Sequence, residues 1–405
     1  MKMRYVVTSI LVLTLNASVA AQWAQWRGPS RDGVATTFTP PAAWPQQLTK
    51  KWQATVGVGH SSPVVSGDRI VIHTRLENRE VVAAYDLASG KQLWQDAVDA
   101  PYTMNPAARA HGPGPKATPA IAAGRVFTLG VSGIFSAHDL ATGKLLWRKP
   151  APAVPQEYGA SNSPIVDGTT VIVFLGGQKG GALTAMDAAT GNVKWQWTGD
   201  VPGYTSPIIA TIAGVKQLIT QSESKVIGVS MTDGKLLWEA RLKTPYNQNI
   251  VTPLMVDGLL ISAGLENPTI AYRITAAMDK GWTATPAWQN EDVSMYMSSP
   301  AVSGKTIFGL SNKNRGQFFA IDSATGKTLW VSKGREADNA SIIRAGNYVL
   351  FSTSNSELIV ARPSATAFEE IKRYTIADSA TYAHPAFVAR TIVVKDVDKL
   401  IVWTF

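Results

Sequence analysis

One phrase of eleven residues recurs along this chain of 405 residues and constrains its fold more than any other feature. It first reads Ala84-x-Asp86-x-x-Ser89-Gly90-x-x-x-Trp94, and in each copy a tryptophan follows a glycine by four positions. Five copies end at Trp94, Trp147, Trp195, Trp238 and Trp330. Such a fixed period indicates a repeat architecture, in which each unit buries its apolar face against its neighbours.

A second phrase marks the start of each unit, and it consists of a small or polar residue followed by proline and an alternating apolar segment. Its copies are Ser62-Pro63, Thr118-Pro119, Ser163-Pro164, Ser206-Pro207, Thr252-Pro253, Ser299-Pro300 and His384-Pro385, and Ser341-Ile342 falls where another is due. We place each proline at the first residue of a strand, where its missing N–H does least harm. Eight starts, about 48 residues apart, predict eight units of four short strands.

The end of each unit predicts how the units pack. The Asp-x-x-Ser/Thr-Gly element is typical of a tight turn, because aspartate accepts backbone N–H bonds and glycine adopts a positive φ. We expect the tryptophan after the turn to pack between neighbouring sheets. In the seventh unit we take Tyr374 as its replacement.

The last unit, from Pro385 to Phe405, lacks a turn phrase and a tryptophan strand, and Lys50–Ala54 near the other end supplies Trp52. Pairing these two ends would close a ring and remove its exposed edges. The predicted fold is therefore all-β, an eight-bladed β-propeller with four-stranded antiparallel blades and a ring closed by pairing of the N- and C-terminal strands.

The first 21 residues have the pattern of a secretory signal peptide. Lys2 and Arg4 precede an apolar stretch and a run of small residues, and cleavage after Ala20 or Ala21 fits equally well. The apolar stretch is shorter than the roughly 20 residues that span a bilayer, and no later segment is long enough. We expect a periplasmic or secreted protein whose residues 22–405 form one propeller domain, with residues 22–47 as an N-terminal extension packing on it.

Composition narrows the possible functions. The chain has no cysteine, which excludes disulfides, a cysteine nucleophile, thiolate metal sites and a lipid anchor on cysteine. The formal net charge is +9, yet no run of lysine and arginine alternates with aromatics, so nucleic-acid binding is not expected. The chain contains no Gly-x-Ser-x-Gly elbow, His-Glu-x-x-His helix or calcium-loop pattern.

The Ala-x-Asp-x-x-Thr-Gly-x-x-x-Trp units, together with the opening Gln25-Trp26-Arg27-Gly28-Pro29-Ser30-Arg31-Asp32-Gly33-Val34, resemble bacterial proteins of the pyrroloquinoline quinone (PQQ)-like β-propeller repeat family. The resemblance covers nearly the whole mature chain. It implies kinship both with quinoprotein dehydrogenases, which hold PQQ and calcium, and with the non-catalytic scaffold lipoprotein of the outer-membrane β-barrel assembly machinery. Short loops and the lack of a vicinal cysteine pair separate this chain from the dehydrogenases, and the lack of an anchoring cysteine separates it from the lipoprotein.

The linkers that precede the proline phrases are predicted to meet at one end of the central channel, and they are rich in tyrosine, histidine and asparagine. The candidate ligand-binding residues are His60, Arg109, His111, Tyr158, Asn162, Tyr204, Tyr246, Asn247, Asn249, Tyr296, Asn339, Tyr382 and His384. Such a funnel could bind a small polar or aromatic ligand, a quinone included, or an extended peptide. The alternative is that these residues satisfy buried backbone groups and waters at the channel mouth.

Two hypotheses on function follow. The first is a non-catalytic binding or scaffold protein of the cell envelope that engages a protein or peptide partner. The second is a small PQQ-dependent oxidoreductase with its cofactor in the funnel. No catalytic residue or metal ligand is assigned, and no cofactor is firmly implied, because among the linkers only Asp338 is an acid close to a proline phrase, with Glu157 nearby.

Overall fold

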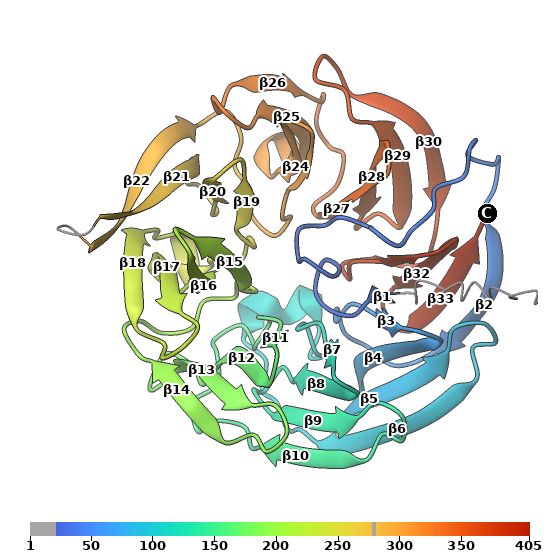
Figure 1. The fold of residues 1–405 in the computed structure, drawn as a ribbon. Coiled ribbons are helices and arrows are strands. Elements are labelled where there is room, and N and C mark those ends of the chain that lie inside the picture. The colour runs from blue at the N-terminus through green and yellow to red at the C-terminus, as the bar shows by residue number, and fades with distance from the viewer. Residues whose placement is uncertain (1–21, 278–280) are drawn as a thin grey trace, which may run out of the picture.

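The computed structural model describes residues 22–277 and 281–405, which form eight antiparallel sheets arranged as a ring (Figure 1). The signal peptide predicted for residues 1–21 lies outside the described residues. In the described ranges, no helix has the length and apolar character needed to cross a membrane. The prediction of an eight-bladed β-propeller is confirmed.

Blades 1 to 4 each contain four consecutive strands that start with a short strand at the channel. Blade 1 consists of β3 (Val64–Ser66), β4 (Arg69–Leu76), β5 (Arg79–Asp86) and β6 (Gln92–Asp99), and blade 2 of β7 (Ala120–Ala122), β8 (Arg125–Leu129), β9 (Phe135–Asp139) and β10 (Leu145–Lys149). Blade 3 consists of β11 (Ile165–Asp167), β12 (Thr170–Leu175), β13 (Ala182–Asp187) and β14 (Val193–Trp197), and blade 4 of β15 (Ile208–Ile212), β16 (Val215–Gln221), β17 (Lys225–Ser230) and β18 (Leu236–Arg241).

Blades 5 to 7 repeat this plan, and blade 8 departs from it. Blade 5 consists of β19 (Leu254–Val256), β20 (Leu259–Ser262), β21 (Thr269–Ala277) and β22 (Gly281–Asn290), and blade 6 of β23 (Ala301–Ser303), β24 (Thr306–Ser311), β25 (Gln317–Asp322) and β26 (Thr328–Val331). Blade 7 consists of β27 (Ala340–Ala345), β28 (Tyr348–Thr353), β29 (Glu357–Arg362) and β30 (Glu369–Thr375). The described part of the chain has three short 3-10 helices, which lie in loops: η1 (Pro106–His111), η2 (Pro245–Asn247) and η3 (Lys313–Arg315).

Blade 8 is built from both ends of the chain. Its inner strands are β31 (Ala386–Val388), β32 (Thr391–Lys395) and β33 (Lys399–Thr404), and its outer strand is β2 (Thr49–Thr55). β2 runs antiparallel to β33, with Thr49 opposite Thr404 and Trp52 opposite Val402. The predicted closure of the ring is therefore confirmed. The chain also adds a fifth strand to blade 1, because β1 (Gln22–Trp23) pairs with β3.

The repeated tryptophans join each blade to the next. Trp94 on the outer strand of blade 1 donates from Nε1 to the carbonyl oxygen of Leu140 in blade 2, at 2.9 Å. Its ring lies against Gly143 of the next Asp-x-x-Thr-Gly turn, where an added Cβ would come within 2.5 Å of the indole. The pairs Trp52 with Gly90, Trp147 with Gly191, Trp195 with Gly234 and Trp288 with Gly326 repeat this contact. The glycine thus both adopts a positive φ and leaves room for the indole of the preceding blade.

The assignment of Tyr374 to the tryptophan position is wrong. In blade 1, Trp94 lies opposite Ala84, next to a register shift between β5 and β6. In blade 7, the residue next to the corresponding register shift is Lys372, which lies opposite Val360. Tyr374 lies two positions further along β30 and donates from its hydroxyl to the carbonyl oxygen of Pro45, at 2.7 Å. Sequence reasoning missed this position because Lys372 carries no aromatic ring, whereas Tyr374 nearby does.

The proline phrases lie one residue outside the strands rather than at their first residues, since β3 begins at Val64, directly after Pro63. At several of these phrases the hydroxyl before the proline joins two blades, as when Thr118 donates from its backbone N to Ser163 Oγ at 2.9 Å. The same bond links His384 to Ser62, Ser62 to Thr118, Ser163 to Ser206 and Thr252 to Ser299. A serine or threonine at this position therefore helps to hold the inner edges of the blades in a ring.

Candidate functional site

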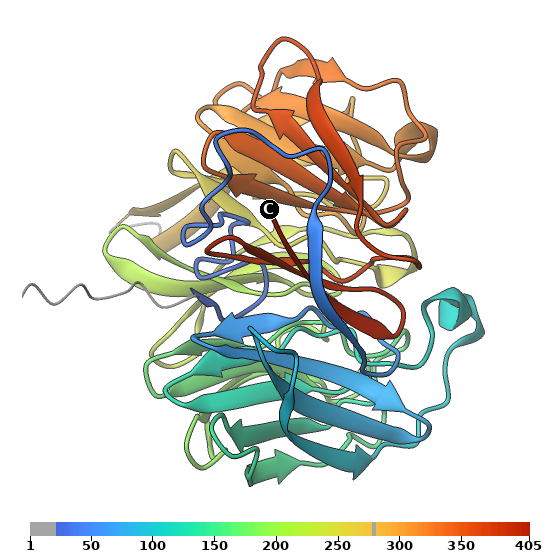
Figure 2. The same ribbon diagram turned by 90° about the vertical axis from the view of Figure 1, so that its right-hand side faces the viewer.

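The segment of residues 22–39, called here the N-terminal plug, crosses the centre of the ring on one face (Figure 1). It pairs Trp23 with Val65 of blade 1, and Val34 forms a parallel bridge with Arg344 of blade 7. Thr39 donates from its backbone N to the carbonyl oxygen of Ala389 in blade 8, at 2.7 Å. Figure 2 shows η1 on the opposite face of the ring. The plug therefore closes one end of the channel and leaves the other face for access.

Two buried arginines fasten the plug to the starts of blades 6 and 3. Arg27 is 1% exposed and donates from Nη1 to the carbonyl oxygen of Ser299 in the linker before blade 6, at 2.8 Å. Arg31 is 2% exposed and donates to the carbonyl oxygens of Pro164, at 2.8 Å, and Ser163, at 3.0 Å, before blade 3. Burial lowers the pKa of Arg27 to about 10 and the pKa of Arg31 to about 9. Both therefore remain charged at neutral pH, with backbone carbonyls as their partners.

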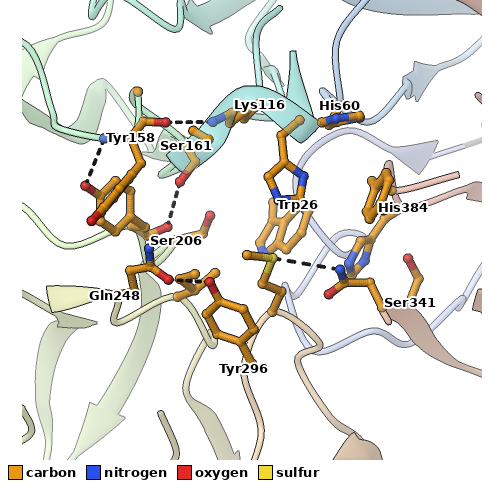
Figure 3. A pocket seen from close by; sticks show the side chains of 18 of the residues that line it. Trp26, His60, Lys116, Tyr158, Ser161, Ser206, Gln248, Tyr296, Ser341 and His384 are labelled. Atoms are coloured by element: carbon orange, nitrogen blue, oxygen red, sulfur yellow. Dashed lines mark hydrogen bonds between the residues drawn. The ribbon is translucent and has the colours of Figure 1, made fainter. Parts of the chain in front are cut away.

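A cavity of about 200 Å³ lies above the plug, and all eight linkers between blades contribute to its wall. That volume far exceeds the roughly 15 Å³ that one buried water needs. Figure 3 shows Trp26 of the plug inside the ring of linker side chains. The lining side chains include Trp26, His60, His111, Lys116, Tyr158, Ser161, Tyr204, Ser206, Gln248, Tyr296, Met297, Asn339, Ser341, Thr381, Tyr382 and His384.

Eight of the thirteen predicted residues lie on this wall, namely His60, His111, Tyr158, Tyr204, Tyr296, Asn339, Tyr382 and His384. The structure places the other five elsewhere. Arg109 is exposed on η1, Tyr246 is 72% exposed, and Asn247 lies next to it in η2. Asn162 and Asn249 are fully buried outside the cavity wall.

The two buried asparagines match the alternative interpretation, in which linker residues satisfy backbone groups. Asn249 donates from Nδ2 to the carbonyl oxygens of Ser222, at 2.8 Å, and Leu242, at 2.9 Å. Asn162 accepts at Oδ1 from the backbone N of Phe174, at 3.1 Å. These side chains hold loops in place. The prediction rested on position in a linker alone, and that position does not distinguish them from side chains that face the channel.

Eight of the lining side chains named above were not among the predicted residues: Trp26, Lys116, Ser161, Ser206, Gln248, Met297, Ser341 and Thr381. Trp26 donates from Nε1 to Thr252 Oγ1 at 2.8 Å, and its ring lies 4.2 Å from that of His384. It comes from the plug and not from a linker, so the repeat pattern gave no signal for it. Lys116 lies two residues before the Thr118-Pro119 phrase, and its position there was the signal that could have found it.

Lys116 is the cation of this wall, while the histidines are neutral. Its ammonium donates to the carbonyl oxygen of Tyr158 at 2.6 Å, and burial lowers its pKa to about 8. Burial, with smaller repulsion from His111 and two lysines, lowers the pKa of His60 to about 3. Burial also lowers the pKa of His111, and it lowers the pKa of His384 far more strongly. Near neutral pH, Lys116 therefore keeps a positive charge and the imidazoles remain uncharged.

Three polar atoms of the wall have no hydrogen-bond partner in the protein although they are buried: His60 Nε2, Asn339 Oδ1 and His384 Nδ1. Buried polar groups normally have partners. His384 is only 4% exposed, so its free nitrogen cannot be satisfied from bulk solvent. Unpartnered amide atoms also occur away from the wall, at Asn162 Nδ2 and Asn249 Oδ1, so these atoms do not by themselves mark a ligand site.

The same wall does not fit PQQ held by calcium. Calcium takes six to eight oxygen ligands, carboxylates prominent among them. No aspartate or glutamate is among the residues that line the cavity, and Lys116 would repel a divalent cation. Over the described ranges, no cluster of three or more histidine, aspartate or glutamate side chains is arranged to hold a metal ion.

Comparisons with known proteins agree with the architecture. A family model described as outer membrane protein assembly factor BamB matches residues 39–157 and 78–332. The curated BamB of Yersinia pestis is 23% identical over 301 residues, covering 70% of each chain, and that of Nitrosomonas eutropha is 24% identical over 300 residues, covering 70% of this chain and 66% of the relative.

Two solved structures share the fold. BamB from Moraxella catarrhalis superposes with a TM-score of 0.66 at 16% identity, over 88% of this chain and 98% of that one. A quinohemoprotein alcohol dehydrogenase from Comamonas testosteroni superposes with a TM-score of 0.69 at 15% identity, over 96% and 81%. At these identities the likeness concerns the fold alone.

Proposed function

The chain belongs to the family of the outer membrane protein assembly factor BamB, and on that basis we propose that it is a non-catalytic scaffold of the cell envelope that binds a protein partner during outer membrane protein assembly. The observation that carries this proposal is the family match, which reaches from residue 39 to residue 332. Curated BamB proteins that align with about 70% of this chain support it further.

The geometry suits a rigid platform. The contact of each repeated tryptophan with the following turn crosses from one blade to the next, and so does each backbone bond to a serine or threonine hydroxyl. The ring therefore resists bending between blades. β2 locks the first and last parts of the chain together, and the plug fastens the centre. A partner that binds such a surface meets groups already held in position, which reduces the entropy lost on binding.

The proposal includes the location and processing of the protein. Residues 1–21 act as a cleaved signal peptide, and residues 22–405 form one domain that works in the periplasm or after secretion. A thioether-linked lipid anchor requires a cysteine, and the sequence contains none. Edman sequencing of the exported protein should begin at Ala21 or Gln22.

Two measurements in the native organism test the scaffold role. Deletion of the gene should lower the amounts of outer membrane β-barrel proteins, while periplasmic proteins, the matched control, keep their levels. A photo-crosslinker at Tyr246, which is 72% exposed beside the funnel, should capture a specific envelope protein. Unchanged β-barrel levels together with an empty crosslinking lane would overturn the proposal.

The oxidoreductase hypothesis is tested by a separate assay. Purified protein with PQQ and calcium should show no dye-linked oxidation of alcohols or sugars, because the cavity wall carries no carboxylate for the metal. Turnover under these conditions would favour the quinoprotein hypothesis over the scaffold.

A further inference from the structure

The seam between blades 1 and 2 contains two buried histidines, His73 on β4 and His138 on β9 (Figure 1). Counting along each strand from the residues of the blade turn finds the matching positions in other blades. In place of His73, blades 2, 3 and 6 hold the buried side chains Leu129, Phe174 and Leu310. In place of His138, blades 3 and 6 hold the buried side chains Met186 and Ile321. Apolar side chains carry no hydrogen-bonding requirement into a seam, so the histidines give this one a polar character that the other two positions lack.

A buried carboxyl group lies in the same seam. Glu80 on β5 is 2% exposed, and its Oε2 lies 3.7 Å from His73 Nε2. Its Oε1 accepts from the backbone N of Val131 in blade 2, at 2.8 Å. Arg75 Nη1 lies 4.0 Å from the same oxygen, but this guanidinium also donates from Nη2 to the carbonyl oxygen of Ala100, at 2.6 Å. The carboxyl group therefore faces a backbone donor and a cation that it shares with another acceptor.

A small cavity extends from this carboxyl group toward solvent. Its volume is about 10 Å³, on the order of what one water molecule needs, and both histidines and Glu80 line it. Asp96 and Arg148 line it too, and both are partly exposed. Asp96 Oδ2 accepts from Arg148 Nη2 at 2.9 Å and lies 2.9 Å from His138 Nε2. Polar side chains thus run from the buried carboxyl group to the surface.

Glu80 is held in a balance between burial and its neighbours. Burial raises the pKa of Glu80 to about 7, while the bond from Val131 and the charge of Arg75 oppose this rise. The backbone N–H of Ser132 and the charge of Arg148 oppose it more weakly. The carboxyl group therefore changes its charge near neutral pH.

The other titratable groups of the seam keep their charges in this range. Burial lowers the pKa of His73 to about 3, and burial also lowers the pKa of His138 despite its bond to Asp96. Although burial raises the pKa of Asp96, the bonds from His138 and Arg148 are stronger and keep it below its usual value. Both imidazoles are thus neutral and Asp96 is ionised when Glu80 loses its proton.

The loop of residues 130–134, between β8 and β9, closes the seam over Glu80. An added Cβ at Gly130 would collide with Glu80 Oε2, so the loop leaves no room for water on that side. A buried carboxylate needs more hydrogen bonds than a neutral carboxyl group, and here they can come only from water admitted by a shift of the loop. The carbonyl oxygen of Val131 accepts from the backbone N of Ala160, at 3.0 Å. A shift would therefore reach the linker before blade 3.

We propose that the seam between blades 1 and 2 is a pH-operated joint. When Glu80 loses its proton, water enters through the cavity and the loop of residues 130–134 moves away from blade 1, and protonation closes the seam again. The joint needs no partner and lies outside the central cavity. Its test can therefore fail while the scaffold role stands, and the reverse.

Amide hydrogen exchange at pH 6.0 and pH 8.5 tests the joint, with each rate divided by that of an unfolded peptide at the same pH. Protection of the Val131 N–H should fall roughly tenfold between the two, because the closed seam holds the proton up to about pH 7 and a hydrated carboxyl group only up to about 4.5. Gly181, which donates to Gly177 in the matching loop of blade 3, should keep its protection. Small additions of urea should not change exchange at Val131, since a local opening exposes little surface.

Variants assign the effect to Glu80. Glu80→Gln keeps the shape of the side chain without a titrating proton, so protection at Val131 should be equal at the two pH values. Glu77→Gln, at an exposed carboxyl group of the same blade, is the matched control and should behave as the wild type. Melting curves show whether each variant folds, and the wild-type series with urea decides the question if Glu80→Gln does not fold. Protection at Val131 that is the same at both pH values in the wild type, exchange there that follows urea as global unfolding does, or a pH effect that survives in folded Glu80→Gln would overturn the proposal.

Discussion

The replacement Arg31→Met tests how the N-terminal plug is held. The guanidinium of Arg31 makes two bonds to backbone carbonyls, at 2.8 and 3.0 Å, and it is 2% exposed. Bonds from a charged donor contribute about 1.5–3 kcal/mol each, so their loss removes about 3–6 kcal/mol. Methionine fills a similar space and avoids the cost of burying a cation, which offsets part of that loss. We expect the free energy of unfolding to fall by about 3 kcal/mol.

Urea unfolding followed by tryptophan fluorescence measures this change, and amide exchange locates it. The backbone N–H groups of Ala35 and Arg344, which bond the plug to blade 7, should exchange faster in the variant. Arg373→Met is the control, because its ion pairs with Glu357 and Glu370 are exposed and worth at most about 1 kcal/mol. If Arg31→Met costs no more than the control and exchange at Ala35 is unchanged, packing rather than the arginines holds the plug.

Two further predictions concern stability. Deleting residues 46–56 removes β2 and should lower the free energy of unfolding of the whole ring by more than about 5 kcal/mol, and an unchanged melting curve would refute the sealing role of Trp52. Glu80 lies buried between blades 1 and 2, and burial raises its pKa to about 7, although a bond from Val131 opposes this. The folded state then holds the proton more tightly than the unfolded chain, so the free energy of unfolding falls as pH rises from about 4.5 to 7. In urea titrations, Glu80→Gln should recover about 3 kcal/mol relative to the wild type at pH 8 compared with pH 5. Equal stabilities of the two proteins at pH 8 would contradict this.

The blades could be predicted from the sequence because each carries its own marks. Turn aspartate, glycine and tryptophan are local in the sequence, and their spacing reports strand lengths directly. The tryptophan position of blade 7 was missed because Lys372 now occupies it, and a lysine carries no signature of the role. The roles of Gly143 as a docking surface and of Thr118 as a link between blades depend on a neighbouring blade, which a single copy of the repeat cannot reveal.

The funnel could be predicted only in part, for two physical reasons. The linker rule locates a residue near the channel but does not fix the direction of its side chain, so Asn249 and Tyr204 looked alike although only Tyr204 lines the cavity. The plug occurs once and has no period, and its bonds reach far along the chain, with Arg27 and Ser299 lying 272 residues apart. The sequence therefore showed Trp26 and the buried arginines as part of a motif, but it did not show that this segment forms the floor of the cavity.

The shared construction of blade 8 has a consequence for how the chain folds during synthesis. β2 is made long before its partner β33, because Thr404 lies 355 residues after Thr49, to which it pairs. Until β33 has been made, the edge of β2 has no partner strand, and such unpaired edges can pair with other chains. Contacts between distant parts of a sequence also form slowly. Stalled or truncated chains should therefore be the aggregating species of this protein, and loss of only the final strand should be enough to produce them.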